Sequence, residues 1–454
     1  MKKYEMLPTE ENLIETMYKD TINRNKDIVY FYNILQAQES ASTIAIDGRW
    51  GSGKTFFVCQ TKLVINALNL SCDMDEEEKA KITIRFPFPK NNEENENCSI
   101  AVYFDAWEND NDTEPVLSLI YEITKQLSVD FSLSDKSIVK TAGAIIEAIS
   151  GHNVNGIMDT LTSEDPFTKF KEQKVVQQKI KDFFTGLLAE RGNRLVIFID
   201  ELDRCKPTFA VHLLEQIKHY IFDDRITFVF SVNLEQLQHT IKHYYGADFD
   251  ACRYLDRFFD LRISMPPIDL DKFYSQFGLE SRYYVDIVTK QVIKMFNFEL
   301  REITRFYLQV KAAVYEPTHN SSKYDFSFSD GKGRHIILMY IVPLLIGLKI
   351  ADISKYDDFI NGRDIEPLIK LFDMDEENRL LENMLNHDES FEKAEGKKLV
   401  TQEEIIKRFY DAIFVNQYNG SEYSTILGQY EFSKESKPFA LSASSMMSNF
   451  AELS

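Results

Sequence analysis

The amino-acid sequence predicts an α/β protein, with a parallel sheet over residues 40–265 and mostly helical structure after it. The main observation is a pair of continuous apolar runs, RLVIFID at residues 194–200 and ITFVFSV at residues 226–232. Such runs are typical of strands that helices cover on both faces. Helical spacing separates the two runs, and strands that alternate with helices favour a parallel sheet. From Asp269 onward the strand pattern largely disappears, which predicts a helical second part.

Apolar spacing gives the other elements of the sheet region. Helices are expected at residues 10–38, 54–70 and near 170–190, and strands at residues 43–47, 99–104 and 261–265. A further helix has Val116, Ile120, Ile123 and Leu127 on one face, and Pro115 favours its start. These elements alternate along the chain as a parallel sheet requires.

Composition divides the chain into four expected regions. They are an α/β core at 1–268, a helical lid at 269–320, a helical C-terminal domain for a partner or signal at 321–432, and a mobile tail at 433–454. Within the core, residues 73–98 are rich in Asp, Glu and Asn and contain FPFPK. We interpret them as an acidic surface insertion.

Charge, cysteines and hydropathy favour a cytoplasmic protein. The 454 residues carry 52 basic and 72 acidic side chains, and the net charge of −20 opposes broad adhesion to nucleic acid or anionic lipid. The five cysteines form no CxxC pair, which argues against a disulfide framework. The N-terminus lacks the apolar stretch of a secretory signal. The most apolar run, Ile336–Leu348, contains Pro343 and is shorter than the roughly 20 residues of a membrane-spanning helix, so it predicts a buried core helix.

The motif GRWGSGKT at residues 48–55 directly follows the first expected strand and opens a helix. This is the GxxxxGK[ST] pattern, in which backbone N–H groups surround phosphates, the lysine reaches the β and γ oxygens, and the hydroxyl binds Mg²⁺. It predicts ATP and Mg²⁺ as cofactors, with Lys54 catalytic and Thr55 a metal ligand. The expected nucleotide-binding residues are Gly48, Arg49, Trp50, Gly51, Ser52, Gly53, Lys54, Thr55 and Phe56.

An acidic pair at the end of the run RLVIFID completes the expected site. Asp200 is a candidate Mg²⁺ ligand, and Glu201 a candidate base for an attacking water. The tandem favours hydrolysis over a small-molecule kinase, which can use the hydroxyl of its acceptor. The alternative for Glu201 is a helix cap.

Four further polar residues are candidates. Asn233, preferred to Ser231, lies where the next strand ends and could orient the water or sense the γ-phosphate; a turn-forming role is the alternative. Arg253 and Arg257 lie four residues apart and are candidate arginine fingers across a subunit interface, against simple pairing with Asp256 or Asp260. Arg301, four residues before Arg305, could reach the γ-phosphate from a lid, or lie on the surface.

The order of GRWGSGKT, VYFDAWENDNDTEPVLSLIYEI, VIFIDELDRC, TFVFSVNLEQL, YLDRFFDLRISMPP and LREITRFY resembles the KAP family of P-loop NTPases over roughly residues 10–310. The resemblance implies a P-loop core of the additional-strand, catalytic-glutamate type with a helical lid. It supports Lys54, Thr55, Asp200 and Glu201, with Arg301 as a sensor-like arginine.

Two departures from the family pattern stand out. The family strand commonly ends FNAW or FNPW, whereas residues 104–107 read FDAW, so the carboxylate of Asp105 replaces an amide. Many members have two membrane helices between the two nucleotide motifs, whereas residues 140–158 are interrupted by Glu147 and other polar residues, which looks like a soluble member.

Bacterial KAP proteins are associated with phage exclusion, so the resemblance implies an ATP-hydrolysing, oligomeric switch or assembly platform in antiviral defence, with a separate effector or sensor protein. Two alternatives stay open. One is a scaffold that nucleotide stabilises with little hydrolysis, and the other is a motor or clamp that nucleic acid stimulates, which the acidic charge disfavours.

Overall fold

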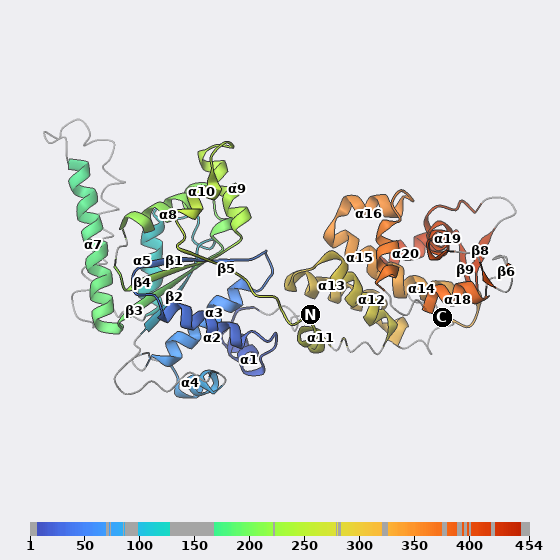
Figure 1. The fold of residues 1–454 in the computed structure, drawn as a ribbon, viewed down its shortest axis with the longest axis horizontal. Coiled ribbons are helices and arrows are strands. Elements are labelled where there is room, and N and C mark those ends of the chain that lie inside the picture. Colours follow the sequence, from blue (N-terminus) through green and yellow to red (C-terminus); the bar gives the residue numbers. More distant parts are fainter. Residues whose placement is uncertain are drawn as a thin grey trace. The chain divides into compact units, whose positions relative to one another are not determined.

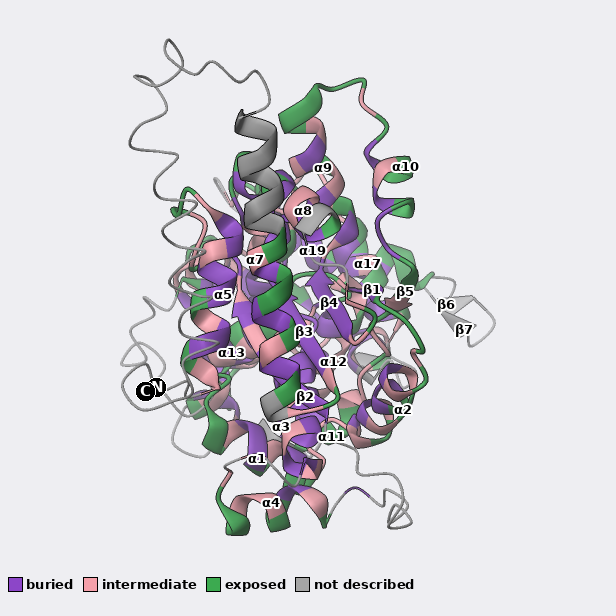
Figure 2. Ribbon diagram, turned by 90° about the vertical axis from the view of Figure 1, so that its left-hand side faces the viewer, coloured by how far each residue is buried: buried purple, intermediate pink, exposed green. Residues whose placement is uncertain are grey.

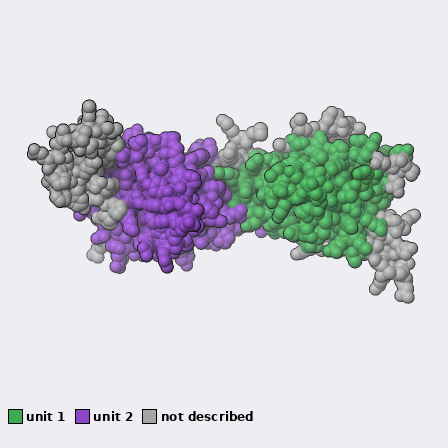
Figure 3. Space-filling model, turned by 90° about the horizontal axis from the view of Figure 1, so that it is seen from above, with its two compact units in different colours: residues 1–5, 274–454 green, residues 6–273 purple. Residues whose placement is uncertain are grey.

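The structure is a computed structural model of the chain. It describes residues 7–69, 72, 74–84, 86, 99–127, 168–220, 223–277, 279, 283–319, 326–374, 379–387, 393–394, 397–398, 401–418 and 423–445. The chain divides into two compact units (Figure 3), Met6–Phe273 and one that contains Tyr274–Ser454. We call them the sheet unit and the helical unit and describe each by itself.

The sheet unit contains a five-stranded parallel sheet, which confirms the predicted fold class. Its strands are β1 (Ser42–Asp47), β2 (Ser99–Asp105), β3 (Arg194–Asp200), β4 (Ile226–Val232) and β5 (Leu261–Ser264). They lie in the order β2-β3-β4-β1-β5. Strand β4 therefore separates β1, which leads into GRWGSGKT, from β3, which ends at Asp200. This inserted strand is the additional strand that the resemblance implied.

Helices cover both faces of the sheet (Figure 1). One face packs against α1 (Glu10–Lys19), α2 (Asn25–Gln36), α3 (Lys54–Leu68) and α4 (Glu76–Thr83). The other packs against α5 (Pro115–Gln126), α7 (Thr168–Arg191), α8 (Pro207–Tyr220), α9 (Leu234–Tyr245) and α10 (Ala251–Asp256). On β3, Val196 and Phe198 belong to the first core while Ile197 and Ile199 belong to the second. Alternate side chains of a strand point to opposite faces, so two cores require a continuous apolar run.

The helical unit is built around one buried helix, α15 (Val342–Ala351). Its described helices are α12 (Tyr284–Phe296), α13 (Leu300–His319), α14 (Ser329–Ile336), α15, α16 (Ile353–Ile360), α17 (Glu366–Asp373), α18 (Arg379–His387), α19 (Gln402–Phe414) and α20 (Ser436–Ser444). A hairpin of β8 (Ser424–Leu427) and β9 (Tyr430–Ser433) and a short pair, β6 (Lys393–Ala394) and β7 (Lys397–Lys398), complete it. A further helix, α11 (Leu270–Phe277), crosses the boundary between the units.

The apolar run at Ile336–Leu348 lies in this core. Helix α14, a π-helical turn η4 (Ile337–Ile341) and α15 join into one helical segment, Ser329–Ala351, which is long and apolar enough to span a membrane. Of its apolar 18-residue stretch 67% is buried inside the protein, and Leu344, Leu345 and Ile346 are fully buried. The burial favours a core helix. The π-helical turn ends two residues before Pro343, whose missing N–H breaks the regular hydrogen-bond ladder.

The structure differs from three sequence expectations. Within 73–98, α4 is an integral part of the fold, because Ile82 and Phe86 are buried in the core beside α1 and α3. The expected mobile tail at 433–454 contains α20, which packs through Ala440 and Ala443, so small residues that read as a tail form a helix contact. The helical region also contains the β8–β9 hairpin. Its strands are too short to give a clear strand pattern in the sequence. Residues 140–158 lie outside the described chain.

Candidate functional site

Polar side chains gather where the parallel strands end. Asp105 on β2 and Asp200 on β3 are register partners, and Asp200 is also the partner of Ser231 on β4. Asp47 ends β1, where its Oδ1 accepts a hydrogen bond of 2.9 Å from the backbone N–H of Leu234. Strands β3 and β4 are buried up to and including these ends (Figure 2). The carboxyl ends of parallel strands are where ligands bind in open α/β sheets.

The loop between β1 and α3 has the geometry of a phosphate-binding loop. Gly51 and Gly53 have φ of 87° and 85°, a left-handed conformation that glycine adopts without steric cost. A Cβ on Gly48 would lie 2.9 Å from both Met265 Cγ and Ser52 Oγ, so only glycine fits there without a shift. The loop leads directly into the N-terminus of the 15-residue helix α3, which favours an anion.

Two groups in this loop fit a phosphate. The Lys54 ammonium is buried and donates to the carbonyl oxygens of Gly48 (2.5 Å) and Arg49 (3.2 Å). Burial lowers the pKa of Lys54, and the nearby carboxylates of Asp203 and Asp200 oppose that shift. The buried Ser52 hydroxyl has no hydrogen-bond partner among the described residues. A buried polar group without a partner is costly, and phosphate oxygens would satisfy both groups.

Asp200 and Thr55 form the part of the site that fits Mg²⁺. Asp200 is buried, and its Oδ2 accepts from Thr55 Oγ1 at 2.7 Å and from the Tyr103 hydroxyl at 3.1 Å. Its Oδ1 accepts from the backbone N–H of Glu201 at 3.0 Å. A carboxylate and a hydroxyl side by side are hard oxygen donors, the kind that Mg²⁺ prefers. Tyr103 holds the carboxylate from the side of β2.

Glu201 follows Asp200 in an uncommon backbone conformation. Its φ of 60° is left-handed, and it begins a 3₁₀ turn, η2 (Leu202–Arg204). Burial raises the pKa of Glu201 to about 7, and the charge of Asp200 adds to the shift, whereas Arg204 and Lys54 lower it. Its Oε2 forms an ion pair with Arg204 Nε. A carboxylate with a pKa near neutral is suited to general-base chemistry.

The order of these features along the chain agrees with a known family. The sequence profile described as KAP family P-loop domain matches residues 24–313. The chain belongs to the KAP family of P-loop NTPases. A search of curated proteins found no match. The matched region of this KAP protein includes the phosphate-binding loop, the acidic pair and most of α13.

Asp105, which departs from the family's amide, stabilises the turn after β2. Its Oδ1 accepts from the backbone N–H of Glu108 at 3.0 Å. Burial raises the pKa of Asp105, the Glu108 N–H opposes that shift, and the charge of Asp200 on the neighbouring strand adds to it. The carboxylate therefore has a structural partner, and it lies in register with the acidic residue that leads to Glu201.

Asn233 caps a helix. Its Oδ1 accepts from the backbone N–H groups of Glu235 (3.1 Å) and Gln236 (3.3 Å) at the start of α9. This is the turn-forming alternative, and its role toward a nucleotide stays a prediction. Ser231 is buried one strand away from Asp200, and its hydroxyl has no hydrogen-bond partner within the described chain.

The candidate finger arginines are exposed, and the chain directly after them runs to the amino end of β1. Arg253 is on α10 and Arg257 directly follows it. The segment after them is joined to the start of β1, because the N–H of Asp260 donates to Thr43 O at 2.8 Å. The phosphate-binding loop follows the opposite end of β1, about 13 Å away for a strand rise of about 3.3 Å per residue.

Among the described residues, Arg253 and Arg257 do not form the surface pairs with Asp256 or Asp260 that were the alternative for them. Asp256 pairs with Arg262 at 2.7 Å, and the Asp260 carboxylate accepts from the N–H of Thr43 at 2.8 Å. Arg301 and Arg305 are exposed on α13 in the helical unit. The structure thus brings together the loop, Asp200 and Glu201, while the chain after Arg253 and Arg257 runs to the amino end of β1 and Arg301 lies in the other unit.

Sequence reasoning missed three residues of this corner, Tyr103, Asp203 and Arg204, and the contacts that Trp50 makes with two of them. Trp50 Nε1 donates to Asp203 Oδ2 at 2.6 Å, and the guanidinium carbon of Arg204 lies 5.4 Å from the ring centroid of Trp50. Tyr103 contacts Asp200, as described above. The sequence contained a signal: folding alone does not require a tryptophan inside a glycine-rich loop, or charged residues three and four positions after Asp200.

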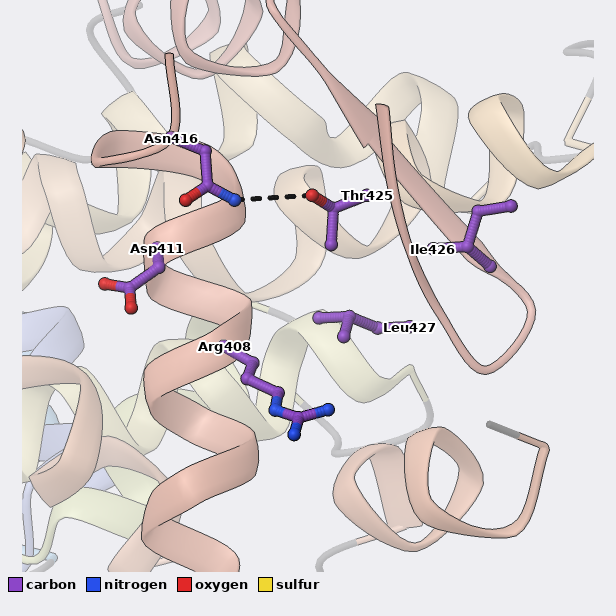
Figure 4. A pocket seen from close by; sticks show the side chains of 6 residues that line it. All are labelled: Arg408, Asp411, Asn416, Thr425, Ile426 and Leu427. Atoms are coloured by element: carbon purple, nitrogen blue, oxygen red, sulfur yellow. Dashed lines mark hydrogen bonds between the residues drawn. The ribbon is translucent and has the colours of Figure 1, made fainter. Parts of the chain in front are cut away.

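A small open hollow also lies in the helical unit, between α19 and β8 (Figure 4). It has a volume of about 230 Å³, and Asn416 Nδ2 donates to Thr425 Oγ1 across it at 3.3 Å. Its lining is Arg408, Asp411, Asn416, Thr425, Ile426 and Leu427. It contains none of the predicted site residues.

Proposed function

We propose that this KAP protein is a Mg²⁺-dependent ATP hydrolase. One observation carries the proposal: the contact of Thr55 with Asp200 at 2.7 Å, next to a partly buried Glu201 whose pKa is raised to about 7. A nucleotide-binding protein that only stores its ligand needs the first feature. The raised pKa of Glu201 reflects a cost in stability, because burial disfavours the ionised carboxylate. A role of Glu201 in hydrolysis explains why the protein keeps this residue there.

Each residue has a distinct part in this proposal. The loop N–H groups and Lys54 bind the phosphates, for which Lys54 gives up its bonds to Gly48 and Arg49. Thr55 and Asp200 hold Mg²⁺, which when bound neutralises charge on the phosphates. Glu201 accepts a proton from the attacking water.

Binding and turnover, measured separately, test this function. Glu201→Gln should bind Mg²⁺–ATP as the wild type does but turn over roughly 10² to 10⁴-fold more slowly, the usual contribution of a general base. Glu11→Gln, an exposed change on α1, is the matched control and should leave both unchanged. Equal turnover in Glu201→Gln and wild type would remove Glu201 from the reaction.

We further propose that the active form is an oligomer in which Arg253 or Arg257 acts on a neighbouring chain. Both are exposed, and the chain directly after them runs to the amino end of β1, opposite to the end that leads into the phosphate-binding loop of the same chain. An arginine at that position contributes to catalysis only in trans, as arginine fingers do in other NTPases.

Mixing two inactive variants tests the arrangement in trans. Glu201→Gln chains keep both arginines, and Arg257→Ala chains keep Glu201, so a mixed assembly contains sites with both groups. Turnover in the mixture above the sum of the two separate samples is the expected result, and the same experiment with Arg253→Ala decides between the arginines. No recovery with either variant would refute catalysis in trans.

A nucleotide-stabilised scaffold is the second candidate, and the ion pair of Glu201 with Arg204 favours it. A paired carboxylate is less available to water, so basal turnover would be slow. Turnover near zero at every protein concentration, with nucleotide bound, would support the scaffold. A motor or clamp predicts instead hydrolysis that nucleic acid stimulates with steep salt dependence.

The cellular role is proposed from family membership. We propose a cytoplasmic switch or assembly platform in bacterial antiviral defence, with Asn233 and Arg301 as sensors of the γ-phosphate and the helical unit as the part that binds a separate effector or sensor protein. The cysteines Cys59, Cys72, Cys205 and Cys252 are free thiols, which is consistent with a reducing compartment. Survival of phage-infected cells with wild type, but not with Glu201→Gln, is the expected result.

A further inference from the structure

Arg204 lies where three segments of the site meet. It closes the turn after Glu201, since its backbone N–H donates to the carbonyl oxygen of Glu201 at 3.0 Å. Its guanidinium carbon lies 5.4 Å from the ring centroid of Trp50, in the phosphate-binding loop, and 5.5 Å from that of Trp107, after β2. These distances are within the range of cation–π contacts, so one cation contacts the loop, the end of β2 and the turn after β3.

The same guanidinium forms an ion pair with the carboxylate of Glu201. Arg204 Nε pairs with Glu201 Oε2, and both side chains are largely buried, with exposed fractions of 21% and 17%. An ion pair with this little exposure is screened less than a surface pair. A carboxylate oxygen in contact with a guanidinium is less available to accept a proton from water, so the ion pair disfavours catalysis.

Trp50 connects this pair to the loop that would receive the phosphates. Its indole N–H is held by Asp203 Oδ2 at 2.6 Å, one residue before Arg204. Its backbone belongs to the segment that must surround the phosphates, next to the carbonyl of Arg49 that accepts from Lys54. When Lys54 leaves that carbonyl for a phosphate, the segment that carries Trp50 loses a contact. Trp50 contacts both Asp203 and Arg204, so a shift of this segment changes the surroundings of Arg204.

We propose that Arg204 is a positioning residue that restrains Glu201 in the resting protein, and that filling the phosphate-binding loop weakens this restraint through Trp50 without abolishing it. The inference rests on the proposed ATP hydrolysis and adds its regulation. The restraint and a purely structural role for Arg204 predict opposite results. Loss of a restraining residue should increase turnover, whereas loss of a structural residue should reduce it.

Turnover of Arg204→Met tests the restraint. This variant keeps much of the length of the side chain but removes the charge, so kcat should rise by roughly two- to fivefold, the effect of releasing a weak to moderate ion pair. KM should fall, because a loop whose filling weakens the restraint is itself filled more readily once the restraint is gone. Lys206→Met, which removes an exposed cation two residues later, is the matched control and should change neither constant. An unchanged or lower kcat in Arg204→Met would overturn the proposal.

Tryptophan fluorescence gives a readout that does not depend on turnover. The chain has two tryptophans, and both contact Arg204, so the emission reports this corner alone. A non-hydrolysable ATP analogue with Mg²⁺ should change the emission of the wild type, and the change should be much smaller in Arg204→Met and intermediate in Arg204→Lys. An equal change in all three would overturn the link through Trp50, and Arg204→Lys covers the case in which Arg204→Met does not fold.

The outcomes separate this inference from the proposed function. Hydrolysis by the wild type without acceleration in Arg204→Met overturns the restraint alone. Nucleotide binding without hydrolysis in either protein overturns both, since there is then no reaction to restrain. Hydrolysis in Arg204→Met but not in the wild type supports both.

Discussion

The two compact units differ in how their buried polar side chains are placed. In the sheet unit, Lys54, Asp200, Asp203 and Ser231 are buried together at the strand ends. The helical unit is organised around α15, where a run of aliphatic residues is fully buried. Its buried Asp286 is already satisfied, since Tyr315 OH donates to Oδ1 at 2.7 Å. The difference teaches that buried polar groups concentrated at one edge mark a site, whereas apolar burial marks a core.

We expect the largest difference between the units, in stability and nucleotide binding, when one core side chain in each unit is truncated to alanine. Leu345→Ala should destabilise the helical unit by about 2–5 kcal/mol, the usual range for a fully buried leucine, and leave nucleotide binding unchanged. Ile197→Ala on β3 is the counterpart in the sheet unit and should weaken nucleotide binding through loss of stability. Calorimetric unfolding with and without nucleotide measures both. An equal loss of nucleotide binding in the two variants would end the distinction between the units.

A glycine in the helical unit sharpens the comparison. A Cβ on Gly333 would lie 2.1 Å from Glu431 O on β9, so Gly333→Ala forces α14 and the hairpin apart. Helix propensity alone favours alanine by about 1 kcal/mol, but the clash is larger, and we expect a net loss of about 1–3 kcal/mol. Asp330→Ala, an exposed change on the same helix, is the control. Chemical denaturation that shows Gly333→Ala to be more stable than wild type would contradict the close packing.

Removal of one hydroxyl in the sheet unit should affect metal binding with little effect on stability. Tyr103→Phe removes the hydrogen bond to Asp200, and loss of a group that holds a metal ligand typically weakens metal binding by about tenfold or more. A Mg²⁺ titration of nucleotide binding measures the shift. Tyr121→Phe, exposed on α5, should show none. The same Mg²⁺ dependence in Tyr103→Phe and wild type would mean that Tyr103 does not position Asp200.

The smallest effect is on pH dependence. Because the pKa of Glu201 is raised to about 7, the carboxyl gains a proton as the pH falls through 7 and then cannot act as a base. Because kcat/KM reports the pKa values of the free enzyme, kcat/KM should be about fourfold lower at pH 6.5 than at pH 8. A rate that stays constant down to pH 5 would indicate a carboxylate with an ordinary pKa or a step other than proton transfer as the limit.

The sequence predicted the sheet better than the helical unit, for physical reasons. Runs such as RLVIFID are buried on both faces and can be read locally, and the glycines of residues 48–53 are required by backbone conformation. The contacts of α20 and β9 depend on distant partners, and no local pattern marks them. Arg204 was missed for the same reason, because it contacts two tryptophans that are 154 and 97 positions away in the chain.

ATP turnover and particle mass, measured together over a range of protein concentrations for wild type and Glu201→Gln, test the central claim most directly. The account predicts wild-type turnover that rises as the particle mass rises, and Glu201→Gln that assembles and binds nucleotide equally but hydrolyses at least about a hundredfold more slowly. Turnover that does not depend on Glu201 would contradict the account, because it would place the chemistry outside the edge where Thr55, Asp200 and Glu201 meet.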